Sequence, residues 1–175
     1  SEFIWTIDGR AMPQFSGFAK DSFSWTAGEV GSSLSISLVI KKLDGATINV
    51  STRIYVSDLA VVWKANTSIP RWYKGKALPV KTASVIVSAI PTFIIDGKQI
   101  SSDRLIFTWT INGTLAFSGP GKQLVTAQIP RIPFTSAIIH VKVQDFSKRI
   151  IKQEYISIAP REPLVSVYAL QPLGG

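Results

Sequence analysis

The sequence predicts an all-β fold made of antiparallel β-sandwiches in tandem. Three observations lead to this prediction: part of the chain repeats after about 104 residues, apolar and polar residues alternate in both copies, and Asp-Gly or Asn-Gly pairs separate the alternating runs. No segment carries a sustained apolar stripe of helical period, and β-branched and aromatic residues dominate. With 175 residues, 46% of them hydrophobic and 17% charged, the chain has enough apolar material for about two folded cores.

The first repeated element begins near the amino terminus. Residues 3–9 (FIWTIDG) reappear 104 positions later as residues 107–113 (FTWTING), so that Trp5 matches Trp109. We expect both tryptophans to be structural core residues that fill the space of roughly 10 Å between two packed sheets. A role as ligand platforms is the disfavoured alternative.

The next predicted strands are residues 34–40 and 137–143. Apolar side chains stand at every second position of both segments: Leu34, Ile36, Leu38 and Ile40 in the first copy, and Ala137, Ile139, Val141 and Val143 in the second. A period of two places one set of side chains on the core face of a sheet and the other set toward solvent. Both segments are therefore predicted to be half-buried strands.

A further pair of similar segments defines the predicted domain boundaries. Residues 59–63 (LAVVW) resemble residues 164–168 (LVSVY), 105 positions later. A period of this length has the size of one sandwich module. We therefore expect residues 1–58 to be a partial or short module and residues 59–160 a complete one. Residues 161–175 would be a linker with the first strand of a following module, or a strand donated to another chain.

The predicted module at residues 1–58 would have an exposed edge where its first strands should lie, and bare sheet edges tend to pair with other strands. Three explanations compete: a chain cut from a longer repeat protein, strands supplied by a neighbouring subunit, and a naturally short module. We favour the first. The second would make the protein a self-assembling, pilus-like filament subunit completed by strand donation.

Turn signals support the strand predictions. Asp8-Gly9, Asp44-Gly45, Asp96-Gly97 and Asn112-Gly113 each stand between apolar alternating runs, as in β-hairpins. The prolines, Pro91 among them, are predicted to fall between strands. The connectors at 57–58 and 159–163 are short, and the second contains two prolines, so we expect limited flexibility and a rod-like shape.

Composition restricts the chemistry that the chain can carry. It contains no cysteine, which excludes disulfides, thiolate nucleophiles and cysteine-ligated metals. No apolar run is long enough to span a membrane, and the start of the chain does not have the pattern of a secretion signal, so we expect a soluble chain whose signal or anchor is absent from it. The formal charge of +8 favours anionic partners, although a generic basic surface is the simpler interpretation.

These segments resemble the immunoglobulin-like superfamily and, within it, the modules named after polycystic kidney disease (PKD) that occur in bacterial surface and secreted proteins. Residues 109–113 are similar to the Trp-containing third strand and following turn of that family, and residues 138–145 to its late strand, which ends on an aspartate. The first copy is similar at residues 5–9 and 34–40. The resemblance implies extracellular spacer or adhesive modules in tandem, and it implies no functional residue.

Catalytic and metal sites are not expected, and no cofactor is implied. The single histidine, His140, is predicted to face solvent on its strand, and the carboxylates are scattered and do not form a calcium-loop pattern. Calcium bound near a module junction by Asp58 or Asp145 is the disfavoured alternative. Three glycosylation sequons begin at Asn49, Asn66 and Asn112, of which Asn112 is expected to serve a tight turn.

One segment is a candidate ligand site. Residues 59–95 contain no acidic residue, but they do contain five cationic side chains with aromatic rings between them. Such a mixture suits an anionic glycan or cell-wall polymer. The candidate residues are Lys64, Arg71, Trp72, Tyr73, Lys74 and Lys76. The favoured alternative is that Trp63 packs in a strand while Trp72 and Tyr73 cover the end of the sandwich.

The functional prediction is a non-catalytic structural or adhesive module of an extracellular or cell-surface protein. The filament subunit and the carbohydrate- or polyanion-binding module are its alternatives. Expected partners are other copies of the chain or neighbouring modules of a longer chain, and an anionic glycan or cell-wall polymer. Neither a specific nucleic acid nor insertion into a membrane is expected.

Overall fold

The computed structural model describes residues 1–67, 77–80, 83–132 and 135–160. Apart from two short 3₁₀ turns at Pro13–Phe15 and Ser102–Arg104, the regular structure of these residues consists of antiparallel β-strands. The predicted all-β class is therefore confirmed. It follows from the alternation of apolar and polar side chains, which gives each strand one face to bury.

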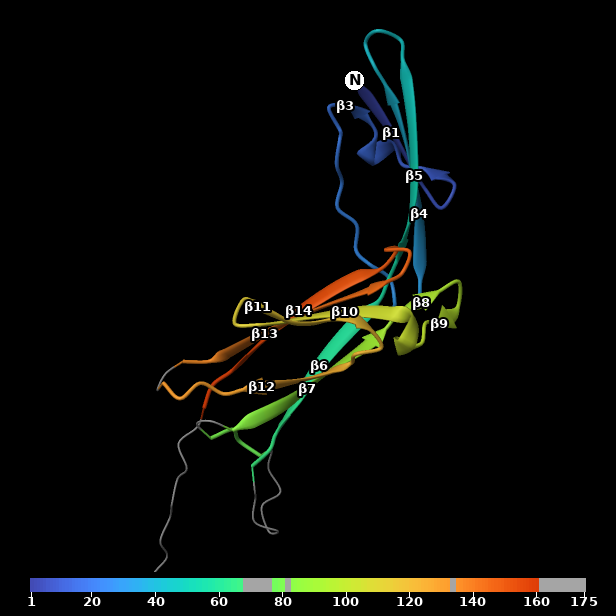
Figure 1. The fold of residues 1–175 in the computed structure, drawn as a ribbon. Helices are drawn as coiled ribbons and strands as arrows, with labels where there is room; N and C mark the ends of the chain where they lie inside the picture. Colours follow the sequence, from blue (N-terminus) through green and yellow to red (C-terminus); the bar gives the residue numbers. More distant parts are fainter. Residues whose placement is uncertain (68–76, 81–82, 133–134, 161–175) are drawn as a thin grey trace, which may run out of the picture.

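The amino-terminal part of the chain forms a single sheet in the order β2-β1-β4-β5. Its long strands are β1 (Glu2–Ile7), β4 (Ser33–Lys41) and β5 (Thr47–Tyr55), and the short strands β2 (Arg10–Ala11) and β3 (Gly17–Phe18) pair with β1. Figure 1 shows this sheet standing upright above the rest of the molecule. In the described residues it has no second sheet packed on it.

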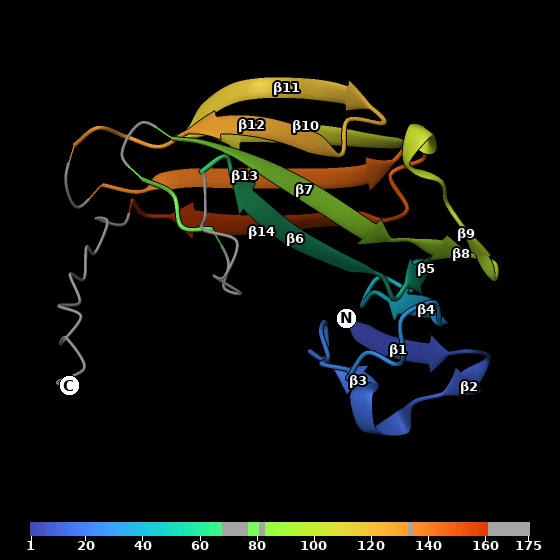
Figure 2. The ribbon, with the colours of Figure 1, turned by 90° about the horizontal axis from the view of Figure 1, so that it is seen from below.

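The rest of the described chain forms a sandwich of two sheets and a small two-stranded sheet, β8 (Ile94–Ile95) with β9 (Lys98–Gln99). One sheet has the order β11-β10-β13-β14, formed by β10 (Leu105–Ile111), β11 (Thr114–Pro120), β13 (Ala137–Asp145) and β14 (Ile151–Ile158). The other has the order β12-β7-β6, formed by β6 (Asp58–Ala65), β7 (Ser84–Thr92) and β12 (Leu124–Gln128). Figure 2 shows β6 and β7 crossing the face of the first sheet.

The core lies between these two sheets. Phe107 and Trp109 from β10 are fully buried in one cluster with Val85, Val87 and Ala89 from β7. Removing a large apolar side chain from water stabilises the fold by about 1.5–3 kcal/mol per residue. The alternating residues of β10, β13 and β7 therefore account for why this part of the chain closes into two layers.

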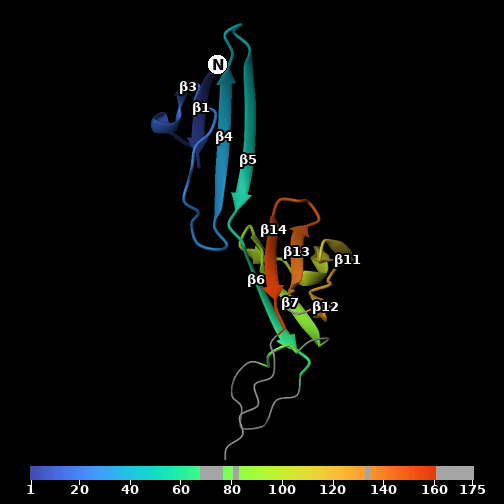
Figure 3. The same cartoon turned by 90° about the vertical axis from the view of Figure 1, so that its left-hand side faces the viewer.

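The two parts of the chain follow each other directly. β5 ends at Tyr55, and β6 begins at Asp58, one residue before the predicted module start and inside the predicted connector. Only Val56 and Ser57 lie between the two strands. Figure 3 shows the amino-terminal sheet and the sandwich end to end, with β5 leading into β6.

The predicted turns are present, but the proline prediction was wrong at Pro91 and at Pro120, which is the last residue of β11. Both residues of Asp8-Gly9, Asp96-Gly97 and Asn112-Gly113 have positive φ, as type I′ hairpin turns require. Pro91, however, lies inside β7, where it is paired with Leu59. The pairing of β7 with β12 extends only as far as Ser88 of β7. Among the described strands, Pro91 therefore has β6 alone as its neighbour, and its missing N–H breaks no bond to β12.

Candidate functional site

The two halves of the chain contain the same tryptophan arrangement. Trp5 of β1 is paired with Leu38 of β4, and Trp109 of β10 is paired with Val141 of β13. The Trp5 indole N–H donates a hydrogen bond to the carbonyl oxygen of Lys20 at 2.9 Å, and that of Trp109 donates to the carbonyl oxygen of Lys122 at 2.7 Å. The sequence match between the two tryptophans thus extends to their hydrogen bonds.

The turns that follow the tryptophans are also equivalent. Asp8 Oδ1 accepts a hydrogen bond from the Ser35 backbone N–H at 2.8 Å, and Asn112 Oδ1 accepts one from the Ile138 backbone N–H at 2.9 Å. Asp8 has a φ of 47° and Asn112 one of 50°. The turn role predicted for Asn112 is confirmed, and its side chain holds the start of the neighbouring strand.

The two equivalent sheets differ in what covers them. Trp109 is 0% exposed because β6, β7 and β12 lie over its sheet, whereas Trp5 is only half-buried. The contrast is larger at the last strand of each sheet. Ile54, paired with Leu34, is 48% exposed, and its counterpart Ile158, paired with Ala137, is 2% exposed.

This exposed surface, which we call the open face, is apolar along all three long strands of the amino-terminal sheet. The pairing register places its side chains on one side. They are Phe3, Trp5 and Ile7 of β1, Leu34, Ile36, Leu38 and Ile40 of β4, and Ile48, Val50 and Ile54 of β5. Among these residues only Ile7 is fully buried. A contiguous apolar surface of this kind is uncommon on monomeric soluble proteins.

Aromatic rings from the segment between β3 and β4 cover part of the open face. Phe23 packs edge-on against Trp5 with ring centroids 4.8 Å apart, and Phe15 stacks on Phe23 at 4.9 Å. Phe15 also meets Trp25 edge-on at 6.4 Å. Beside these rings lies a groove of about 680 Å³, whose apolar lining includes Trp25, Leu34, Ile36 and Ile54.

A second set of contacts lies at the junction between the sheet and the sandwich. Tyr55, at the end of β5, packs on the sandwich core, and the Arg149 guanidinium lies over its ring, 5.9 Å from the centroid. Gly31 lies so close to Ile94 that a Cβ at residue 31 would stand 2.9 Å from the Ile94 Cδ1. Gly31 has a φ of +94°, which few other residues adopt.

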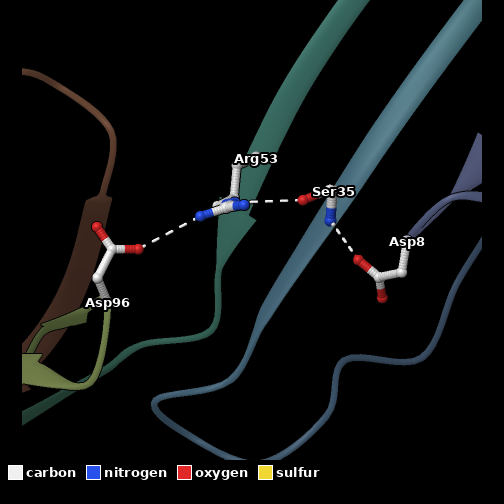
Figure 4. Close-up of polar contacts among 4 residues, drawn as sticks. All are labelled: Asp8, Ser35, Arg53 and Asp96. Atoms are coloured by element: carbon white, nitrogen blue, oxygen red, sulfur yellow. Dashed lines mark hydrogen bonds and ion pairs between the residues drawn. The ribbon is translucent and has the colours of Figure 1, made fainter.

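A chain of polar contacts crosses the same junction. Arg53 of β5 lies 3.3 Å from Asp96 Oδ1, in the turn between β8 (Ile94–Ile95) and β9 (Lys98–Gln99), and its Nε donates to Ser35 Oγ at 3.2 Å. Figure 4 shows that the Ser35 backbone N–H in turn points to Asp8. The turn after β1 is thus connected to the sandwich through three successive polar contacts.

A cleft of about 480 Å³ lies near this junction. Three cationic side chains, Lys98, Arg104 and Arg149, are among its lining residues, and its single carboxylate belongs to Asp145. That carboxylate is buried, accepts hydrogen bonds from the backbone N–H groups of Ile150 at 2.8 Å and Ser147 at 3.2 Å, and forms an ion pair with the Arg149 Nε at 3.5 Å. The sequence indicated Asp145 only as a disfavoured calcium ligand and gave no sign of this cationic cleft.

The other predicted site residues are only partly described. Lys64 is exposed on β6, whereas Arg71, Trp72, Tyr73, Lys74 and Lys76 lie outside the described residues, as does the predicted strand at 164–168. His140 lies on the outer face of β13, but it is half-buried and stacked on Tyr155 with ring centroids 4.2 Å apart. His140 therefore lies on the outer face of its sheet, as expected, but the ring of Tyr155 from the neighbouring strand covers it in part.

Within the described ranges, three or more His, Cys, Asp or Glu side chains do not come together closely enough to hold a metal ion. Those ranges also contain no helix of sufficient length and apolarity to cross a bilayer.

Comparisons with known proteins give little further information. No protein-family model matches the sequence, and no curated protein matches it. A structure search finds a chain described as fibronectin(III)-like modules of Clostridium thermocellum CbhA, at 12% sequence identity and a TM-score of 0.33, covering 98% of this chain and 84% of that one. At so low a TM-score, none of the proposals below rests on this similarity.

Proposed function

We propose that the chain is a non-catalytic structural unit of an extracellular or cell-surface protein, which holds β modules end to end at a fixed spacing. The observation that carries this proposal is the junction between β5 and β6. Only Val56 and Ser57 separate the two strands, and Ser57 is buried. A connector this short leaves the two parts little freedom to move relative to each other.

Contacts from both sides support a fixed junction. Tyr55 reaches the sandwich core from β5, Gly31 touches Ile94 from the segment before β4, and Arg53 reaches Asp96. An exposed ion pair alone contributes only about 0.2–1 kcal/mol. The apolar contacts of Tyr55 and the close approach of Gly31 to Ile94 are therefore the main elements that fix the angle between sheet and sandwich.

Small-angle scattering of the full chain tests this proposal. The expected result is a single elongated particle whose maximum dimension matches the end-to-end arrangement. A variant with about eight Gly and Ser residues inserted between Ser57 and Asp58 should give a broader distance distribution, because such linkers behave as flexible coils. A native chain whose scattering is already as broad as that of the insertion variant would contradict the proposal.

The cationic cleft favours a second candidate function, the binding of an acidic glycan or cell-wall polymer. Lys98, Arg104 and Arg149 line it; Arg149 is paired with the Asp145 carboxylate at 3.5 Å, so Lys98 and Arg104 are the cations that carry this candidate. Retention on immobilised heparin should fall for Lys98→Ala combined with Arg104→Ala and remain unchanged for Lys20→Ala, which removes one exposed cation elsewhere. Equal retention of both variants would remove the cleft as the binding site.

A further inference from the structure

Residues 22–26 follow Lys20, the acceptor of the Trp5 indole hydrogen bond, and have the sequence pattern of a strand but not the structure of one. Lys20 and Lys122 both accept the hydrogen bond of a tryptophan indole, so the two lysines are equivalent positions. Two residues after Lys122, β12 begins at Leu124. Two residues after Lys20, residues 22–26 read Ser-Phe-Ser-Trp-Thr and alternate as a strand would, yet they lie outside any strand.

The sandwich shows what this segment lacks. β12 is held by β7, with Val125 paired with Val87 and Ala127 paired with Val85. The amino-terminal sheet has no counterpart of β7 in the described residues. Phe23 and Trp25, which correspond to Val125 and Ala127, instead gather beside Trp5 and Phe15 without a strand to pair with.

The open face requires a covering layer for the same reason. In the sandwich, the equivalent face is covered by β6 and β7, whose inward residues include Leu59, Val85 and Val87. The amino-terminal sheet does not have such a layer among the described residues, and Ile54 is 48% exposed, whereas the equivalent Ile158 in the sandwich is 2% exposed. A sheet with one apolar face needs a second layer to bury it.

We propose that the open face and residues 22–26 together form a docking site for a partner segment with the chemistry of β6 and β7. The partner is a two-stranded antiparallel layer with Leu, Val or Ala at alternate positions. One of its strands pairs with residues 22–26 as β7 pairs with β12, and its apolar side chains cover Trp5, Ile36 and Ile54. This proposal goes beyond the structural role and does not depend on it.

Two other occupants fit less well. Residues 164–168 of another copy match residues 59–63 in sequence and so correspond to β6, which stands at the edge of its sheet beside β7 among the described strands. A single strand of this kind would leave its own backbone groups and those of residues 22–26 unpaired. Face-to-face pairing of two amino-terminal sheets would bury the apolar side chains. It would also leave the backbone groups of residues 22–26 without a neighbouring strand to bond to.

The test supplies the layer and measures the exposure of the open face. A second copy of residues 58–104 is fused in front of Ser1 of the full chain, because residue 105 corresponds to residue 1. The chain has no cysteine, so Ile54→Cys can be labelled selectively with a thiol reagent. Ser51→Cys, on the opposite face of the same strand, is the matched control. A second control carries Val85→Asp and Val87→Asp in the added copy alone.

The expected result is that the added copy slows labelling of Ile54→Cys by about tenfold or more, since labelling then requires local opening. Labelling of Ser51→Cys should not change, and the copy with two aspartates should not protect Ile54→Cys. Equal rates with and without the added copy would overturn the proposal. So would equal protection by the aspartate-bearing copy, or protection in the native chain that rises with protein concentration, which would indicate a second copy as the occupant.

A measurement on the native chain keeps the proposal testable if the fused protein does not fold. Amide hydrogen exchange of residues 22–26 should be fast, whereas the β12 amides that pair with β7 should be protected. Protection of residues 22–26 equal to that of β12 would show that this segment already has a partner and would overturn the proposal.

Discussion

Ile54 and Ile158 occupy the same position in two copies of one sheet, and yet Ile54 is 48% exposed while Ile158 is 2% exposed. The strands beneath them have the same order and the same register, so the difference comes from the layer above. The sandwich has β6, β7 and β12 on its inner face, and the amino-terminal sheet has irregular chain and a groove. This relationship leads to the first prediction, which concerns the two tryptophans.

Replacing Trp109 by alanine should cost about 3–5 kcal/mol of unfolding free energy, because the side chain is fully buried and the cavity cannot be filled. Trp5→Ala should cost clearly less, because half-burial leaves less apolar area to lose. Urea unfolding followed by circular dichroism measures both values. Equal losses for the two variants would contradict the difference in cover between the two sheets.

Gly31→Ala should lower the free energy of unfolding by more than the strain of an alanine at positive φ alone would. Gly45→Ala is the matched control, because Gly45 also has positive φ (+84°) but has nothing within 4 Å of an added Cβ. The control should lose about 1–2 kcal/mol from strain. Gly31→Ala should lose at least ~1 kcal/mol more, owing to its contact with Ile94. Thermal unfolding of both variants, compared at the same temperature, decides whether they differ.

The Arg53–Asp96 pair should show a small coupling that depends on salt. Both side chains are more than half exposed, so a double-mutant cycle of Arg53→Ala and Asp96→Ala should give about 0.2–1 kcal/mol. The coupling should shrink when ionic strength rises to ~1 M, where the screening length is short. A coupling that does not respond to salt would show that the two residues interact through packing instead of charge.

Asp145→Ala should loosen the turn between β13 and β14. The buried carboxylate accepts hydrogen bonds from the Ile150 and Ser147 backbone N–H groups, and leaving them unpaired costs about 1–3 kcal/mol. Asp145→Asn keeps an acceptor oxygen and should lose less. Exchange of the Ile150 amide hydrogen should accelerate in the alanine variant. Unchanged exchange at Ile150 would mean that the carboxylate does not hold this turn.

The repeat in the sequence predicted the strand segments and their equivalence between the two copies. The match of Trp5 to Trp109 and of residues 34–40 to 137–143 predicted that the two copies are equivalent, and in the structure both copies have the same pairing, Ile7 with Ile36 and Ile111 with Ile139. Short-range signals suffice there, because alternation and Asp-Gly or Asn-Gly turns act within a few residues. The same reasoning missed Pro91, whose tolerance depends on where a neighbouring strand ends.

The interaction surfaces were less accessible to sequence reasoning. Alternation in β4 and β5 predicts a side to be buried, but it does not show whether a second layer is present, so the open face was predicted only as an incomplete module. The contacts of Arg53 with Asp96 and of Gly31 with Ile94 join residues 43 and 63 positions apart (96 minus 53, and 94 minus 31). No local pattern indicates such pairs. The candidate site from Lys64 to Lys76 stays a prediction.

Under the proposed function, the amino-terminal sheet and the sandwich form one rigid, end-to-end arrangement. Residual dipolar couplings of backbone amides in β4, β5, β10 and β13 test it most directly, because they report the orientation of each strand relative to a common frame. We predict that one alignment tensor fits the couplings of all four strands in the relative orientation seen in Figure 3. Two tensors of clearly different magnitude, one for each pair of strands, would show that the parts move independently and would contradict the account.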